Sequence, residues 1–177
     1  MEPPTEKGTC LMAIVGLDAG RSRLPVIDMK KAKGIWATLD EGCNSSCHGS
    51  RWFEDCQSKL QAMGLEGHWI NRDRKSYNVI GNSEVHSVGK RAIPFGLQLE
   101  PSGLVIPGYL ESHELQDSDV PLLLSQKAQA KLGLIKNMKD STVWMSDYPH
   151  QQLKVGQVAG TGLLCVEIGC MTKTMEE

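Results

Sequence analysis

The most concentrated group of reactive side-chain types lies in residues 40–49, with the sequence DEGCNSSCHG. The apolar stretch before it, residues 35–39, predicts a strand that delivers Asp40 to the mouth of a core. Gly42 allows the backbone to turn sharply behind this acid. A carboxylate in such a place is partly desolvated and suits acid or base catalysis. The alternative is a turn aspartate that accepts backbone N–H groups.

The same segment holds side chains of the types that bind zinc. Cys43, Cys47 and His48 lie close together in the chain, and Cys56 follows within reach. Structural zinc sites usually use two separated pairs of ligands, and Cys56 falls on the apolar side of an expected helix, so buried reduced thiols are favoured over a zinc module. Cys47 and His48 are also a weak nucleophile pair, because adjacent residues rarely point at each other. We expect no metal or other cofactor.

Short apolar stretches separated by glycines predict a mostly β fold. Pro101-Ser102-Gly103 is a turn signal, so residues 92–110 are expected to form a hairpin. The expected strands cover residues 11–17, 24–29, 34–39, 77–80, 92–99, 104–110, 120–124, 142–145 and 162–168.

Two segments have helical patterns instead. In residues 50–63 the apolar side chains recur at helical spacing, with Ser50 placed to cap the start and Gly64 to end the helix. Residues 126–132 are rich in helix formers and stop at Gly133. Both helices interrupt the β pattern rather than extend it.

Two motifs together resemble the retropepsin-like aspartic proteases, particularly those of retrotransposon polyproteins. Leu39-Asp40-Glu41-Gly42-Cys43 is similar to the family's apolar strand running into Asp-Thr/Ser-Gly-Ala. Residues 120–134 are similar to its second motif of apolar strand, Leu-Leu-Gly, short helix and Leu-Gly. Residues 77–82 stand where the family has its flap, the hairpin that closes over substrate.

The resemblance implies a closed β-barrel or sandwich with the acid protease fold, one inserted amphipathic helix and one short C-terminal helix. It covers residues 24–145, which leaves residues 1–23 as an N-terminal extension and 146–177 as a C-terminal one. Residues 162–168 in the latter are a possible dimerisation strand. The implied site consists of catalytic Asp40, the loop residues Glu41, Gly42, Cys43 and Ser46, the flap residues Ile80, Gly81 and Asn82, and the supporting residues Leu123, Leu124 and Ser125.

An aspartic protease needs two carboxylates that share one proton. Asp18 also follows an apolar run but lies too close before Asp40 for a second lobe to fit between them. The resemblance therefore implies a homodimer in which each Asp40 is the partner of the other, with an extended polypeptide, a retroelement polyprotein, as substrate.

Two residues depart from the family pattern. Glu41 replaces the Thr or Ser whose hydroxyl braces the dimer, and an ionised carboxylate can only accept hydrogen bonds. Ser125 replaces the glycine of Leu-Leu-Gly. The alternative function is therefore an inactive peptide-binding or structural domain with the same fold.

Composition narrows the possible partners. With 177 residues, 40% hydrophobic and 23% charged, the chain is of globular type, which excludes collagen-like, disordered and disulfide-miniprotein classes. A net charge of -2 argues against nucleic acid, and Arg72, Arg74 and Lys75 are interpreted as solvated loop charges. The apolar run at residues 11–15 is too short for a signal peptide or membrane span, so we expect a cytoplasmic chain without membrane contact.

Overall fold

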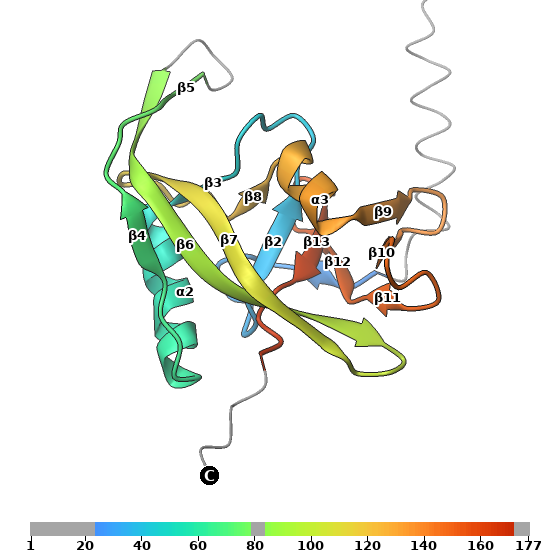
Figure 1. Ribbon diagram of the computed structural model, residues 1–177. Coiled ribbons are helices and arrows are strands. Elements are labelled where there is room, and N and C mark those ends of the chain that lie inside the picture. Colours follow the sequence, from blue (N-terminus) through green and yellow to red (C-terminus); the bar gives the residue numbers. More distant parts are fainter. Residues whose placement is uncertain (1–23, 79–83, 172–177) are drawn as a thin grey trace, which may run out of the picture.

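The computed structural model describes residues 24–78 and 84–171, which form a mostly β structure with two helices in that part of the chain (Figure 1). The predicted mostly β class is therefore confirmed. The helices are α2 (Ser50–Ala62) and α3 (Gln126–Leu132). The strands are β1 (Val26–Ile27), β2 (Trp36–Leu39), β3 (Cys47–Gly49), β4 (His68–Asn71), β5 (Ser76–Asn78), β6 (Glu84–Glu100), β7 (Val105–Leu115), β8 (Leu123–Leu124), β9 (Leu134–Asn137), β10 (Thr142–Met145), β11 (Gln152–Leu153), β12 (Val155–Val158) and β13 (Leu164–Glu167).

One mixed sheet contains most of these strands, in the order β1-β12-β13-β2-β8-β3-β7-β6-β11. β4 and β5 add to β6, while β9 and β10 form a separate antiparallel pair. The long strands β6 and β7 pair antiparallel from Ser87↔Leu115 to Gln98↔Val105, which confirms the predicted hairpin. Figure 1 shows this hairpin crossing the whole molecule.

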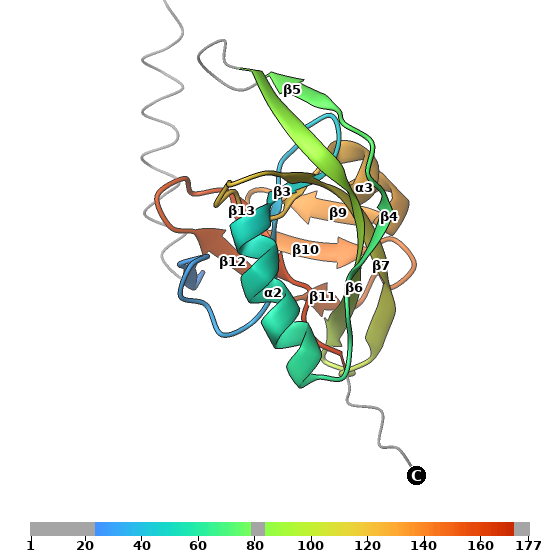
Figure 2. The same cartoon turned by 90° about the vertical axis from the view of Figure 1, so that its left-hand side faces the viewer.

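The core joins α2 to the large sheet and to the β9–β10 pair. Phe53, Cys56 and Leu60 form the buried side of α2, as the helical spacing predicted. They join a cluster with buried residues of β2, β6, β8 and β10, including Leu39 and Leu124. Burial of these apolar side chains is the main force that fixes β2 and β8 side by side beneath the loop after Asp40. Figure 2 shows α2 lying along one side of the sheet.

The helix ends differ from expectation at one point. α2 begins at Ser50, whose side chain makes no cap, because Gly49 occupies the N-cap position. A Cβ at Gly49 would come within 2.0 Å of the Ser118 carbonyl oxygen, so the close backbone contact there requires glycine. α3 has the predicted bounds, and Gly133 ends it in the left-handed region at φ 66°. Neither α2 nor α3 has the length and apolar character needed to cross a bilayer.

Residues beyond 145 continue the sheet. β13 pairs with β12 on one edge and with β2 on the other, so both of its edges are occupied within its own chain. The possible dimerisation strand at residues 162–168 is thus an internal strand beside β2, because its pattern of buried residues places it in the core. The expected strand at residues 11–17 lies outside the described residues.

Candidate active site

Asp40 lies at the end of β2, where the chain leaves the core. β2 runs parallel to β8 with Leu39 opposite Leu124, and the Asp40 N–H donates to the Leu124 carbonyl at 3.1 Å. The Asp40 side chain is partly exposed, and its Oδ1 accepts the Gly42 N–H at 2.9 Å. A Cβ at Gly42 would lie 3.2 Å from that Oδ1, so the glycine leaves room for the carboxylate rather than supplying an unusual backbone angle.

Behind the loop, the two sequence motifs meet through a pair of buried serines. The Ser125 N–H donates to Ser46 Oγ at 3.1 Å, and the two hydroxyls lie 3.3 Å apart. Ser125 Oγ also accepts the Ala128 N–H at 3.2 Å and so caps α3. Leu123 and Leu124 form β8 directly before it. Ser125 thus binds both the loop and the helix, which a glycine at this position has no side chain to do.

Glu41 has its own partner. Its carboxylate forms an ion pair with the Lys136 ammonium on β9. Burial lowers the pKa of Lys136, and the side chain of Glu41 is 49% exposed. Glu41 lines a 350 Å³ cavity together with Leu39, Met138 and Leu163. The negative charge beside Asp40 is therefore balanced within the chain.

The thiols of Cys43 and Cys47 lie 4.0 Å apart in the same loop. Contact with the Cys47 thiol lowers the pKa of Cys43 to about 7, against the opposing effect of burial. The same contact and burial raise the pKa of Cys47. Cys56 lies apart on the core side of α2, where burial raises its pKa to about 12. Within residues 24–78 and 84–171, no three His, Cys, Asp or Glu side chains gather as a metal site would require.

The hairpin of β5 and β6 rises beside this loop, as Figure 1 shows. Tyr77 pairs with Val85 in the antiparallel register, and the Lys75 ammonium donates to Ser45 Oγ at 2.6 Å. The base of the hairpin is thus tied to the loop that follows Asp40. The predicted flap residues Ile80, Gly81 and Asn82 lie outside the described residues.

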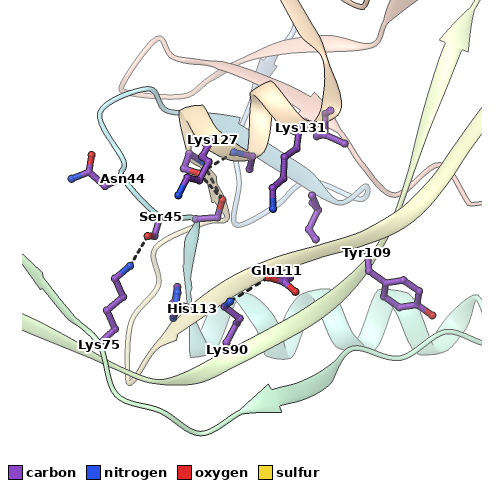
Figure 3. A pocket seen from close by; sticks show the side chains of 14 residues that line it. Asn44, Ser45, Lys75, Lys90, Tyr109, Glu111, His113, Lys127 and Lys131 are labelled. Atoms are coloured by element: carbon purple, nitrogen blue, oxygen red, sulfur yellow. Dashed lines mark hydrogen bonds and ion pairs between the residues drawn. The ribbon is translucent and has the colours of Figure 1, made fainter. Parts of the chain in front are cut away.

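Between the loop, β7 and α3 lies a 550 Å³ cavity, shown in Figure 3. We call it the lysine-lined cavity; its walls include Lys75, Lys90, Lys127 and Lys131, with Glu111 and His113 from β7. Asp40 is not among the lining residues, whereas Ser46 and Ser125 are. The sequence did not predict this group of lysines, because its members come from distant segments of the chain. The one available signal was the spacing of Lys127 and Lys131, four residues apart on one side of a helix.

On the opposite side of β7 a buried polar network replaces the predicted alternatives for His48. His48 is fully buried, with Nδ1 2.8 Å from Ser112 Oγ and Nε2 3.2 Å from Glu114 Oε1. Arg91 donates to the same Glu114 oxygen at 2.8 Å and stacks on the Phe53 and Trp69 rings. A serine, a histidine and an acid are thus in contact, but all three are buried from solvent, so they hold β3, β6 and β7 together rather than act on substrate.

No protein-family model and no curated protein matches the chain. Among solved structures, the chain is similar to the retroviral protease-like domain of Ddi1 from Leishmania major, at 13% sequence identity and a TM-score of 0.42. The match covers 70% of this chain and 94% of that domain. The functional interpretation therefore rests on the geometry around Asp40.

Proposed function

We propose that this chain is a retropepsin-like aspartic endopeptidase that works as a homodimer, with Asp40 as the catalytic acid of each subunit. The main supporting observation is the position of Asp40: its N–H is bonded to Leu124 of the parallel strand β8, and its carboxylate is partly exposed at the end of β2. A hairpin tied to the same loop through Lys75 and Ser45 supports a substrate cleft there.

The dimer is proposed because one chain supplies one such acid. Two carboxylates about 3 Å apart cannot both ionise, so one holds a proton while the other remains a base. Leu163, 40% exposed, lies with Leu39 and Glu41 around the cavity next to Asp40. Exposed apolar side chains beside a catalytic loop favour contact with a second copy there.

In the proposed mechanism the ionised Asp40 removes a proton from a water held between the two acids, and the resulting hydroxide attacks the scissile carbonyl carbon. The protonated Asp40 donates a hydrogen bond to the carbonyl oxygen. When the tetrahedral intermediate collapses, the C–N bond breaks and the nitrogen leaves as an amine with a proton from the acid pair. We propose the polyprotein of a retroelement as the substrate, as the resemblance implies.

A peptide-binding domain without hydrolysis is the second candidate. It is favoured by Glu41, whose carboxylate pairs with Lys136 within the chain and has no hydroxyl proton to donate across a dimer axis. The two candidates share the cleft and differ only in whether Asp40 is reactive.

Cleavage of unfolded casein between about pH 4 and pH 7 tests the proposal, since the pKa values of such an acid pair lie in or below this range. Asp40→Asn should reduce cleavage to background. Asp28→Asn is the matched control, because Asp28 Oδ1 accepts the Lys30 N–H at 3.0 Å in a similar local turn. Equal activity of the Asp40→Asn variant would exclude the mechanism. Absence of cleavage by the unaltered chain, with retained peptide binding, would support the second candidate.

Mixing subunits tests the shared site. When the unaltered chain is mixed with increasing Asp40→Asn chain at constant total concentration, activity should fall as the square of the unaltered fraction. A linear fall would mean that each subunit works alone. Sedimentation velocity on the same samples checks that they are dimers.

A further inference from the structure

We propose that the lysine-lined cavity binds acidic side chains of an extended peptide, so that the chain selects segments in which Asp or Glu stands next to an apolar residue. This inference rests on the peptide cleft proposed above and specifies which peptides enter it. It concerns residues outside the sequence motifs around Asp40.

The first argument is charge. The cavity wall contains four lysines and a single carboxylate, that of Glu111, which pairs with Lys90 at 3.2 Å. Lys75, Lys127 and Lys131 have no carboxylate partner in the part of the chain that the structure describes. The chain as a whole has a net charge of -2, so this concentration of positive charge is local. A concave site with one sign of charge attracts ligands of the other sign.

The second argument is geometry. Lys127 and Lys131 are on successive turns of α3, and Figure 3 shows both extending from that helix beside the cavity. Lys75 and Lys90 lie across from them, on the β5–β6 side. An anionic group in the cavity would therefore have ammonium groups on two sides. Leu110, Ala128 and Leu132 add an apolar part to the wall, which suits the neighbouring side chain of a peptide.

An acidic peptide fits these walls better than a nucleic acid does. Single-stranded nucleic acids use aromatic side chains as stacking surfaces. Tyr109 is the aromatic residue of the wall, and its ring lies 6.0 Å from that of His68, while Figure 3 shows it at the far end from the Lys75 side. Ser46 and Ser125 connect the cavity to the loop of Asp40, so a peptide crossing that loop can continue into it.

The test measures binding to the full chain with Asp40→Asn, so that peptides are bound without being cleaved. The probes are two fluorescein-labelled decapeptides that differ only in Glu-Leu-Glu or Gln-Leu-Gln at their centre, and binding is followed by fluorescence anisotropy. Lys127→Glu with Lys131→Glu removes the α3 side of the cavity. Lys33→Glu with Lys139→Glu makes the same charge change at exposed residues outside the wall and serves as control.

We expect the Glu peptide to bind at least about tenfold tighter than the Gln peptide, and to lose at least about tenfold in affinity in the Lys127/Lys131 variant but less than about twofold in the control. Equal affinity for the two peptides, or equal losses in the two variants, would overturn the inference. A labelled oligouridylate that binds tighter than the Glu peptide would also overturn it. If the unaltered chain binds the Glu peptide but does not cleave it, the proposed protease function is excluded and the inference about acidic peptides stands. If it cleaves both peptides at equal rates, the protease function stands and the inference is overturned.

Discussion

The two faces of the β3–β7–β6 segment of the sheet contain similar residue types with opposite electrostatic outcomes. On the α2 face, the buried Glu114 contacts both the buried His48 and the partly exposed Arg91. On the cavity face, His113 and Lys90 are paired in register, and three further lysines have no acidic partner among the described residues. Strand alternation separates the two groups, since neighbouring residues point to opposite faces. An unpaired charge on the buried face would cost free energy, whereas the lysines on the open face can remain unpaired and available to a ligand.

The largest effect is expected on breaking the buried network. Glu114→Ala leaves the buried His48 and the half-buried Arg91 without their acid, which should cost about 3 kcal/mol in the free energy of unfolding. The matched control is Glu111→Ala, on the same strand but facing the cavity. Its ion pair with Lys90 is exposed on the Glu111 side, so the loss should be below about 1 kcal/mol. Urea unfolding followed by tryptophan fluorescence compares the two variants, and equal losses would remove the distinction between the faces.

Acid should weaken the fold through the same network. Burial lowers the pKa of His48 below its ordinary value of 6.5, although Glu114 partly opposes this. Outside this network, on the cavity face, burial also lowers the pKa of His113. Below about pH 6.5 the unfolded chain binds these protons more readily than the folded chain, so the free energy of unfolding decreases as pH falls, by up to about 1.4 kcal/mol per pH unit for each group.

Glu114 adds to this loss at lower pH. Burial alone would raise its pKa, but hydrogen bonds from His48 and Arg91 outweigh this and hold the pKa below 4.5. The ionised Glu114 therefore adds to the free energy of unfolding above pH 4.5, and this stabilisation is lost as the pH falls further. Urea unfolding at several pH values measures the slope, which His48→Asn should reduce. A stability that stays flat from neutral pH to about pH 5 would contradict the assignment. Cleavage assays in acid need this measurement beside them, so that unfolding is not mistaken for loss of catalysis.

Much of the fold on the Asp40 side could be predicted from sequence, because its signals are local. α3 and β10 have the predicted bounds, and the turn at residues 101–103 predicted the β6–β7 hairpin. These segments contain turn residues, caps and apolar runs that act within a few positions of each other. The support of the Asp40 loop by β8 is not a local signal; it was expected only from the resemblance that two short motifs carry.

Neither the buried network around Glu114 nor the lysine-lined cavity could be predicted, because each is formed by residues of segments that lie far apart in the sequence. β3 is three residues long, fully buried and without alternation, so nothing in it predicts a strand. The predicted strand at residues 104–110 ended before Ser112, His113 and Glu114, which β7 includes. Lys75 and Arg72 are exposed loop residues, as predicted, but nothing in the sequence indicates their contacts with Ser45 and Trp69. Only the register of β3, β6 and β7 shows which charges are paired.

Thiol reactivity can locate the boundary between the open and the buried face. Cys47 is buried in register with His113, and Cys43 is partly exposed in the loop above it, with its pKa lowered to about 7 by the contact with Cys47. Iodoacetamide should therefore modify Cys43 first, at a rate that rises most steeply near pH 7. Cys47 should remain protected, as should Cys165, whose pKa burial raises to about 11.

Peptide mapping by mass spectrometry after brief labelling identifies the modified residue. Cys43→Ser is the control and should remove the fast phase. Labelling of Cys47 as fast as Cys43 would mean that the cavity face opens as far as β3.

The smallest effect is expected for the ion pair at the other rim of the loop. Glu41 and Lys136 are in contact, but the Glu41 side chain is 49% exposed, so water solvates either charge when its partner is removed. Lys136→Gln should therefore change the free energy of unfolding by less than about 1 kcal/mol, well below the effect of Glu114→Ala. If the proposed dimer forms beside this loop, the same substitution should weaken it, because two Glu41 carboxylates would then approach each other without their lysines. Urea unfolding and sedimentation velocity measure the two effects separately, and an unchanged dimer constant would place the subunit contact away from Glu41.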